Sequence, residues 1–189
     1  ELMVRDYASV NWATSKALIR NNYQKQMHYF SMEFLMGRLL VNNMMNLGIY
    51  DIAKEGLADY GINIHELEEL ESDAGLGNGG LGRLPACFMD SLASLSYPAF
   101  GHTIRYTYGF FEQKIEDGYQ VEVPDQWLRL GNAWEVRKPK HQCDVKFFGH
   151  VVWNGEKQKW EHVDAELVRA VPYDVPIVGA DTKVTNTLR

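Results

Sequence analysis

A glycine-rich stretch, residues 73–84, has the composition to bind an anion through its backbone. It reads Asp-Ala-Gly-Leu-Gly-Asn-Gly-Gly-Leu-Gly-Arg-Leu. Glycine permits left-handed φ angles and lets a ligand approach the main chain closely, because it carries no Cβ. Apolar residues at three-and-four spacing then predict a helix from Arg83 to Leu95 with one apolar face: Leu84, Cys87, Phe88, Leu92 and Leu95. A helix N-terminus offers unpaired N–H groups and a positive dipole, so an anion site is predicted, with a purely structural tight turn as the alternative.

Two nucleotide-binding motifs fail on this stretch. Gly75, Gly77 and Gly80 satisfy G-x-G-x-x-G literally. That fingerprint needs a preceding hydrophobic strand and an acidic residue about 20 positions later. Here an acidic helix is predicted before the motif, and residues 97–101, at about that distance, include no acidic residue. No Gly-Lys-Ser or Gly-Lys-Thr is present for a Walker A site. A backbone anion cradle remains.

Glu33 is the second candidate for chemistry. Residues 27–31 are short and aromatic-rich, as a buried strand is, and Ser31 is placed to cap a helix that begins near Met32 and ends at Gly48. Glu33 would then lie in the first turn, where a carboxylate favours the helix dipole. The end of a strand and the start of a helix is also a common edge for ligand sites in α/β folds. Spacing alone favours the structural role.

Composition limits the other classes of function. The six histidines lack ligand spacing, so no metal site is predicted. No nucleophile elbow is present, and no glycosidase pair can be chosen among 25 acidic residues. The net charge of −6 argues against a nucleic-acid or anionic-membrane partner. Two cysteines, without a signal-like or membrane-length segment, favour a cytoplasmic location.

The first half of the chain is predicted to be helical and the second half rich in β-strands, an α/β class with no visible domain boundary. Helices are expected over 3–25, 49–60 and 63–70. Asn63 would cap the last of these, and the acidic run Glu66, Glu68, Glu69 and Glu71 would form its solvated face.

Alternating residues predict the strands of the second half. A strand is expected over 102–108, then a hairpin turned at Asp117-Gly118, then a short helical turn over 125–132. A second meander, turned at Asn154-Gly155, would comprise residues 145–148, 151–153, 159–162, 166–171 and 177–178. Because the chain opens in a helical pattern and closes without a cap, we expect a piece of a longer protein whose uncovered surface favours self-association.

Several motifs in one order resemble the glycogen phosphorylase (α-1,4-glucan phosphorylase) family. Ser-Met-Glu-Phe-Leu-Met-Gly-Arg at 31–38 precedes the glycine stretch, and Ala-Cys-Phe-Met-Asp-Ser at 86–91 follows it. Further matches lie at 101–109, 125–135, 172–174 and 185–189. The resemblance runs from end to end, and it implies that residues 1–189 are the front part of an incomplete N-terminal domain with no internal boundary.

The resemblance implies a GT-B fold, with two Rossmann-like domains around a catalytic cleft. The family carries pyridoxal 5′-phosphate on a lysine of the C-terminal domain and cleaves terminal α-1,4-linked glucose with inorganic phosphate, giving glucose 1-phosphate. That lysine and the phosphate clamps belong to later parts of the family chain. This chain alone is therefore expected to be inactive and not to bind the cofactor, and the parent is expected to be a homodimer.

Site residues follow from the same resemblance. Glu33 matches the active-site glutamate of the family. Gly79 and Gly80 would approach the substrate phosphate and the cofactor, with the Gly80 N–H as a phosphate donor. The Leu81 N–H would contact the glucosyl unit, and Asn78 lies beside them.

Departures from animal members are informative. Leu35 stands where they have a tyrosine against the cofactor, which resembles the bacterial type. Residues 17–20 lack their nucleotide-stacking tyrosine, so the resemblance does not carry over activation by a nucleotide. Pro85 replaces an alanine in the first helical turn, where proline is tolerated, and Ala133 replaces a proline.

Two other functions stay open on the sequence. One is a nucleotide-sugar-dependent glucan synthase of the same architecture, and the other is a non-catalytic carbohydrate- or phosphate-binding module. The sequence does not choose between glycogen, starch and maltodextrin.

Overall fold

A computed structural model describes residues 1–189, apart from the side chain of Phe111. The chain divides into two units. The first unit contains Glu1–Glu135 and Val175–Arg189, and the second contains Val136–Asp174. The assignment of all 189 residues to one incomplete domain stays a prediction.

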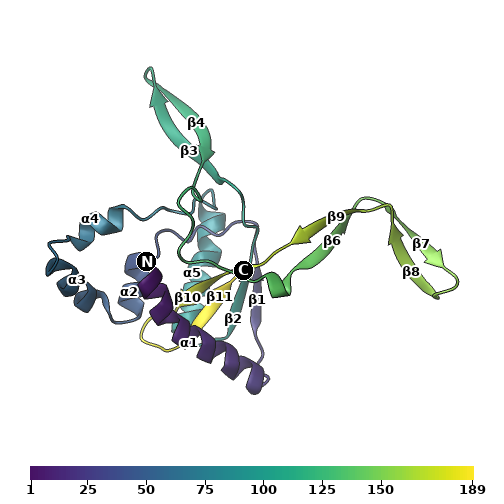
Figure 1. Cartoon of the computed structure of the whole chain (residues 1–189), viewed down its shortest axis with the longest axis horizontal. Helices are drawn as coiled ribbons and strands as arrows, with labels where there is room; N and C mark the ends of the chain where they lie inside the picture. Colours follow the sequence, from purple (N-terminus) through teal and green to yellow (C-terminus); the bar gives the residue numbers. More distant parts are fainter. The chain divides into compact units, whose positions relative to one another are not determined.

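The helices of the first unit agree with most of the predicted positions (Figure 1). Their bounds are α1 Leu2–Asn21, α2 Leu40–Asn46, α3 Tyr50–Ala58, α4 Ile64–Glu69 and α5 Gly80–Ser94. The predicted cap of α4 is confirmed, because the Asn63 side chain accepts a hydrogen bond from the His65 N–H at 3.1 Å.

A mixed sheet forms the centre of the first unit. Its strands are β1 Met27–Phe30, β2 Ala99–His102, β11 Thr185–Leu188 and β10 Tyr173–Val178, of which the last joins this unit from Val175. Strand β2 pairs in parallel with both β1 and β11, whereas β10 pairs antiparallel with β11. The helices between β1 and β2 provide the long crossover that parallel strands require.

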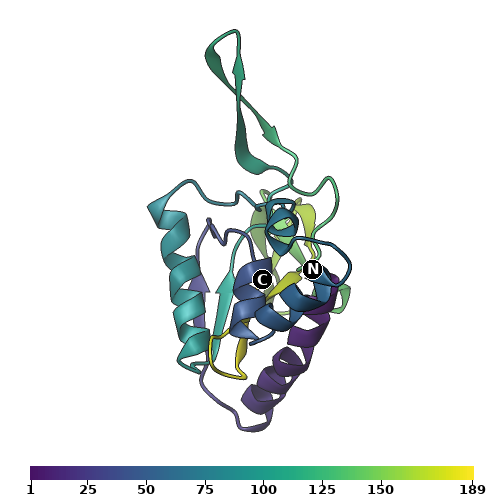
Figure 2. The same cartoon turned by 90° about the vertical axis from the view of Figure 1, so that its left-hand side faces the viewer.

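Helices cover both faces of this sheet. On one face, the Trp12 indole N–H of α1 donates to the Thr187 hydroxyl at 2.8 Å. On the other, Met89 and Ala93 of α5 pack with Leu188. Since Thr187 and Leu188 are consecutive strand residues, their side chains point to opposite faces. Figure 2 shows α1 and α5 on opposite sides of the strands.

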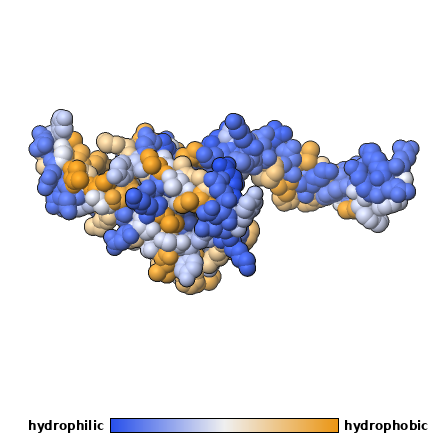
Figure 3. Space-filling view, turned by 90° about the horizontal axis from the view of Figure 1, so that it is seen from below, coloured by the Kyte–Doolittle hydropathy of each residue, from blue (hydrophilic) through white to orange (hydrophobic). Residues whose placement is uncertain are grey.

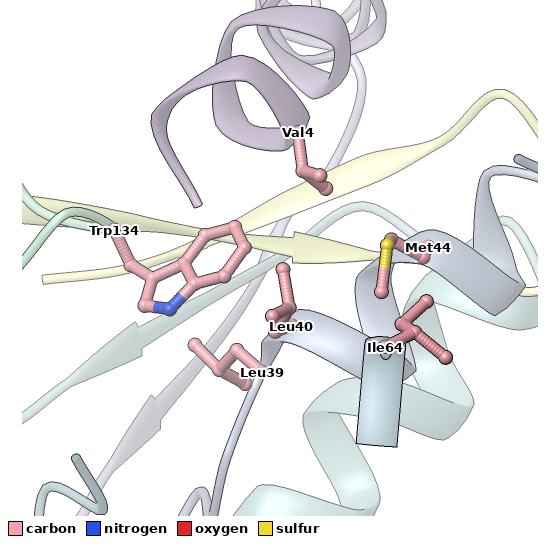
Figure 4. Close-up of a cluster of buried hydrophobic side chains, with 6 residues drawn as sticks. All are labelled: Val4, Leu39, Leu40, Met44, Ile64 and Trp134. Atoms are coloured by element: carbon pink, nitrogen blue, oxygen red, sulfur yellow. The ribbon is translucent and has the colours of Figure 1, made fainter. Parts of the chain in front are cut away.

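The first unit has two hydrophobic clusters. One lies under α5 and includes Phe34 and Ile177. The other, drawn in Figure 4, joins α1, α2 and α4 through Val4, Leu39, Leu40, Met44, Ile64 and Trp134. This second cluster holds α1, α2 and α4 together, although α1 and α4 are distant in sequence.

The helix predicted from Met32 does not form there, because α2 begins only at Leu40. Instead, the Phe34 N–H donates to the Leu76 carbonyl at 3.1 Å and the Leu35 N–H to the Gly82 carbonyl at 2.9 Å. These hydrogen bonds to the glycine-rich region replace the helical bonds that the apolar pattern suggested.

The apolar face predicted for α5 is not the face that packs on the sheet. The exposed fractions are 48% for Leu84, 46% for Phe88 and 68% for Leu95, and Cys87 is exposed too, whereas Leu92 is half-buried. The face that packs is made mainly of smaller side chains, namely Gly82, Pro85, Ala86, Met89 and Ala93. Small side chains let the helix axis lie close to the sheet, which the hydrophobic pattern alone does not reveal.

The strand predicted over 102–108 is wrong, because β2 ends at His102. The hairpin that follows is confirmed, with strands β3 Gly109–Glu116 and β4 Tyr119–Asp125. Its turn has φ of 51° at Asp117 and 83° at Gly118, as the Asp-Gly pair predicts. The predicted helical turn is seen as hydrogen-bonded turns that end at Gly131.

The second unit contains successive antiparallel strand pairs rather than the predicted meander. Strand β5 Val136–Arg137 pairs with the start of β10, and a short 3₁₀ helix covers Pro139–His141. Strand β6 Cys143–Phe147 pairs with β9 Glu166–Ala170, and β7 His150–Asn154 with β8 Lys159–Val163. Positive φ angles at Phe148, Gly149 and Asp164 separate these two pairs. The predicted turn at Asn154-Gly155 is confirmed.

Hydrophobic side chains remain exposed on the chain, and Figure 3 shows groups of them among hydrophilic residues on the face seen from below. Exposed examples are Phe30 at 75% and Phe148 at 80%. Self-association of the chain stays a prediction.

Candidate functional site

The glycine-rich stretch leads directly into the N-terminus of α5. The first helical hydrogen bonds run to the Gly79 carbonyl from the N–H groups of Gly82, at 3.1 Å, and Arg83, at 2.9 Å. The N–H groups of Gly80 and Leu81 come before these bonds, so they are among the donors that a helix cannot satisfy internally. Among the described residues, no side chain caps this end and no acidic residue lies in its first turn. The end of α5 is thus electrostatically suited to an anion.

Glu33 lies against this stretch, although 45 residues separate it from Asn78. Its Oε2 accepts a hydrogen bond from the Asn78 N–H at 3.1 Å. A Cβ on Gly82 would lie 3.0 Å from the same oxygen. The prediction that Glu33 lies in the first turn of its own helix is therefore wrong. Its carboxylate lies beside the N-terminus of α5 instead.

The segment after Glu33 packs against the glycine-rich stretch. The guanidinium of Arg83 donates to the carbonyls of Leu35, at 3.2 Å, and Met36, at 3.1 Å. A Cβ on Gly77 would lie only 2.7 Å from the Leu35 Cβ. Leu35, which the resemblance places near a cofactor, therefore packs directly on the turn.

The glycines of the stretch divide into two kinds. Gly77 and Gly82 are packed, since an added Cβ would meet Leu35 or Glu33 at 3.0 Å or less. A Cβ on Gly79 or Gly80 would meet nothing within 4 Å. The left-handed conformations expected here are absent from all five glycines of this stretch, whose backbone the structure describes. Close approach, rather than positive φ, explains glycine at positions 77 and 82.

Asp125 is a second carboxylate at the stretch that the sequence analysis did not single out. A Cβ on Gly75 would lie 3.0 Å from its Oδ2. Burial raises the pKa of the Asp125 carboxyl, and the charges of Glu112 and Asp73 raise it further. Its position at the end of β4 could be found only from the hairpin register.

Glu71 is a buried residue that the sequence analysis wrongly placed on a solvated face. It is 6% exposed. Its Oε1 accepts from the Leu39 N–H at 2.9 Å and the Trp134 indole N–H at 2.8 Å, and its Oε2 accepts from the Leu40 N–H at 2.9 Å. A side chain distant in sequence therefore caps the start of α2. The lack of a capping residue before Leu40 was the available signal.

The structure thus brings together Glu33, Leu35 and Asn78, with Gly79, Gly80 and Leu81 following on the same turn. In the part of the chain that the structure describes, no cluster of three or more metal-ligating side chains occurs. Within that part, no helix combines the length and apolarity needed to cross a membrane.

Comparison with known proteins adds independent information. A family model described as carbohydrate phosphorylase matches residues 57–189. The chain is 52% identical to glycogen phosphorylase of Bacillus subtilis strain 168 over 189 residues, covering 99% of this chain and 24% of that protein. It is 46% identical over 189 residues to the Chlamydia trachomatis serovar D protein of the same name, covering 98% of this chain and 23% of that protein.

Similarity extends to an animal relative. The liver form of human glycogen phosphorylase is 47% identical over 186 residues, covering 98% of this chain and 22% of that protein. The chain therefore spans about a quarter of the length of these curated relatives.

Proposed function

The chain belongs to the carbohydrate phosphorylase family, and we propose that it forms one wall of the active site of a glucan phosphorylase. The reaction proposed for the longer protein is cleavage of terminal α-1,4-glucosidic bonds by inorganic phosphate, a glycosyltransferase reaction of glycogen or maltodextrin metabolism. The observation that carries this proposal is the contact between Glu33 and Asn78 beside the open N-terminus of α5.

The Gly80 N–H is the proposed donor to the substrate phosphate, and the Leu81 N–H is the proposed donor to the glucosyl unit. Both groups precede the first helical hydrogen bonds, so binding costs no bond of the helix. Open space beside Gly79 and Gly80 lets an anion reach the backbone. Donors of this kind stabilise negative charge that gathers during the reaction.

Glu33 is the proposed active-site carboxylate. Its hydrogen bond to the Asn78 N–H holds the turn that carries the donors, at a distance of 3.1 Å. This contact orients the Gly79–Gly80 backbone toward the ligand.

The residues present fit one wall of a site for pyridoxal 5′-phosphate. Leu35 is held against Gly77, and a Cβ added at Gly79 or Gly80 would meet nothing within 4 Å, so their backbone is open on that side. When bound, this cofactor would supply a phosphate group for proton exchange with the substrate phosphate. We propose that the rest of the site, including the cofactor lysine, lies in polypeptide outside residues 1–189.

A Rossmann-like domain of a GT-B fold is the proposed setting. The parallel strands β1, β2 and β11, with helices on both faces, support this assignment. A cytoplasmic homodimer is proposed for the parent.

The test is a phosphorolysis assay on the longer protein. With maltodextrin or glycogen and inorganic phosphate, it is expected to release glucose 1-phosphate and to show pyridoxal absorbance, whereas residues 1–189 alone release none. Transfer from UDP- or ADP-glucose without dependence on phosphate would instead identify a synthase. Tight maltooligosaccharide binding without turnover would identify a binding module.

A further inference from the structure

A cavity of about 230 Å³ lies between α2, α5 and the end of β10. This volume exceeds the roughly 10–15 Å³ that one water molecule needs, and it is below the about 300–1,000 Å³ of pockets for drug-sized ligands. Part of the lining, including Arg38 and Arg83, is exposed, whereas Leu39 and Ala86 are buried. The cavity therefore opens to solvent and has room for one small molecule.

Asn43 gives the cavity a buried donor that lacks an acceptor. Its side chain is 1% exposed and lines the cavity. Among the residues that the structure describes, its amide Nδ2 has no hydrogen-bond partner. A buried donor without an acceptor is unfavourable, and nearly all such groups in native proteins have a partner. An oxygen atom of a ligand in the cavity would supply that partner.

Asp90 gives the same cavity an acceptor. It lies on α5, where its side chain is half-buried and lines the cavity. Burial raises the pKa of its carboxyl, although the charge of Arg83 lowers it. A ligand that satisfies both Asn43 and Asp90 must therefore accept one hydrogen bond and donate another. Hydroxyl groups do both.

Other classes of small ligand fit this lining less well. An anion would meet the Asp90 carboxylate, and the Arg38 guanidinium already pairs with the Glu69 carboxylate at 3.2 Å. A nucleobase would lack aromatic side chains to stack on, since none occurs in the lining as the structure describes it. A wholly apolar ligand would leave the Asn43 amide unpaired. These comparisons favour a neutral molecule that carries several hydroxyl groups.

We propose that this cavity binds one neutral sugar ring of hexose size, at a site whose lining does not include Glu33. One sugar hydroxyl accepts from the Asn43 Nδ2, and another donates to the Asp90 carboxylate. The C–H groups of the ring pack against the apolar part of the lining, which includes Met36 and Ile177. The inference goes beyond the proposed function and does not depend on phosphorolysis by the longer protein.

Binding of D-glucose to the longer protein tests the proposal. Equilibrium dialysis with labelled D-glucose is expected to give a Kd on the order of 1 mM for the cavity, as suits a small ligand with few hydrogen bonds. Asn43→Leu and Asp90→Asn should each weaken this binding by roughly 10-fold, because each removes one partner of a hydroxyl group. Asn21→Leu, at an exposed residue of α1, is the control and should bind glucose unchanged. Circular dichroism checks that each variant is folded.

Competition distinguishes the cavity from the proposed catalytic cleft. Binding that glucose 1-phosphate abolishes and that neither variant weakens would place the sugar in the cleft and overturn the inference. Absence of glucose binding, as expected if polypeptide outside residues 1–189 fills the cavity, would also overturn it. So would binding of inorganic phosphate, but not glucose, that Asn43→Leu weakens. Glucose binding that both variants weaken would support the cavity site even in a protein without phosphorolysis.

Discussion

Two glycine-to-alanine substitutions separate packing from ligand approach in the glycine-rich stretch. Gly77→Ala places a Cβ 2.7 Å from the Leu35 Cβ and 3.1 Å from the Leu35 N. Neither atom is the end of a flexible side chain, so the backbone has to move. Gly80→Ala places a Cβ where nothing lies within 4 Å. The two changes are chemically identical and three residues apart.

The expected magnitudes differ in stability and in activity. Overpacking of this kind costs about 1–3 kcal/mol, so Gly77→Ala should destabilise the fold. Gly80→Ala should leave stability unchanged or raise it by up to about 1 kcal/mol, because alanine favours a helix. If the Gly80 N–H donates to a phosphate, the methyl group obstructs a hydrogen bond to a charged group that is worth about 1.5–3 kcal/mol. That loss corresponds to roughly a 10- to 100-fold fall in kcat/KM.

The assay uses both forms of the protein. Thermal unfolding of the 189-residue chain, followed by circular dichroism, should show a Tm lower by roughly 3–10 °C for Gly77→Ala only. Phosphorolysis by the longer protein should show the fall in kcat/KM for Gly80→Ala. Full activity of the Gly80→Ala enzyme would refute the proposed backbone donor. A Gly77→Ala chain as stable as the unsubstituted 189-residue chain would refute the packing argument.

Other predictions concern stability. Glu71→Ala should destabilise the chain by about 2–4 kcal/mol, because buried N–H donors lose their acceptor; Glu69→Ala, at an exposed carboxylate, is the control in a urea titration. Glu135→Gln should cost about 1 kcal/mol by weakening hydrogen bonds of 2.8 and 2.6 Å from Arg105, and high salt should reduce the difference between the urea midpoints. Burial raises the pKa of the Asp90 carboxyl, so the folded state binds its proton more tightly than the unfolded state. Stability should therefore rise as the pH falls from neutral through this raised pKa toward the ordinary value, and Asp90→Asn should remove that rise and be more stable at pH 7. The urea midpoints of the unsubstituted chain and of Asp90→Asn are compared as the pH falls. A difference between them that does not change with pH would contradict the last prediction.

Local sequence was sufficient wherever a structural feature depends on neighbouring residues. The Asp117-Gly118 hairpin turn, the Asn63 cap and the position of α5 follow from backbone preferences and short-range hydrogen bonds, which the sequence contains. The family was also evident from motifs in one order. The start of α2 was not, because the Phe34 backbone can bond within a helix or to the glycine-rich stretch, and local preference does not distinguish these options.

The site itself shows the same division. The sequence by itself determined that a glycine-rich stretch leads into a helix, and hence that the N-terminus of this helix can accept an anion. Only tertiary structure decided which glycines are packed, that Glu33 meets Asn78, and which face of α5 is buried. The physical reason is that these features depend on contacts between residues distant in sequence, 45 positions apart for Glu33 and Asn78, whose distances are fixed by how the sheet and helices pack.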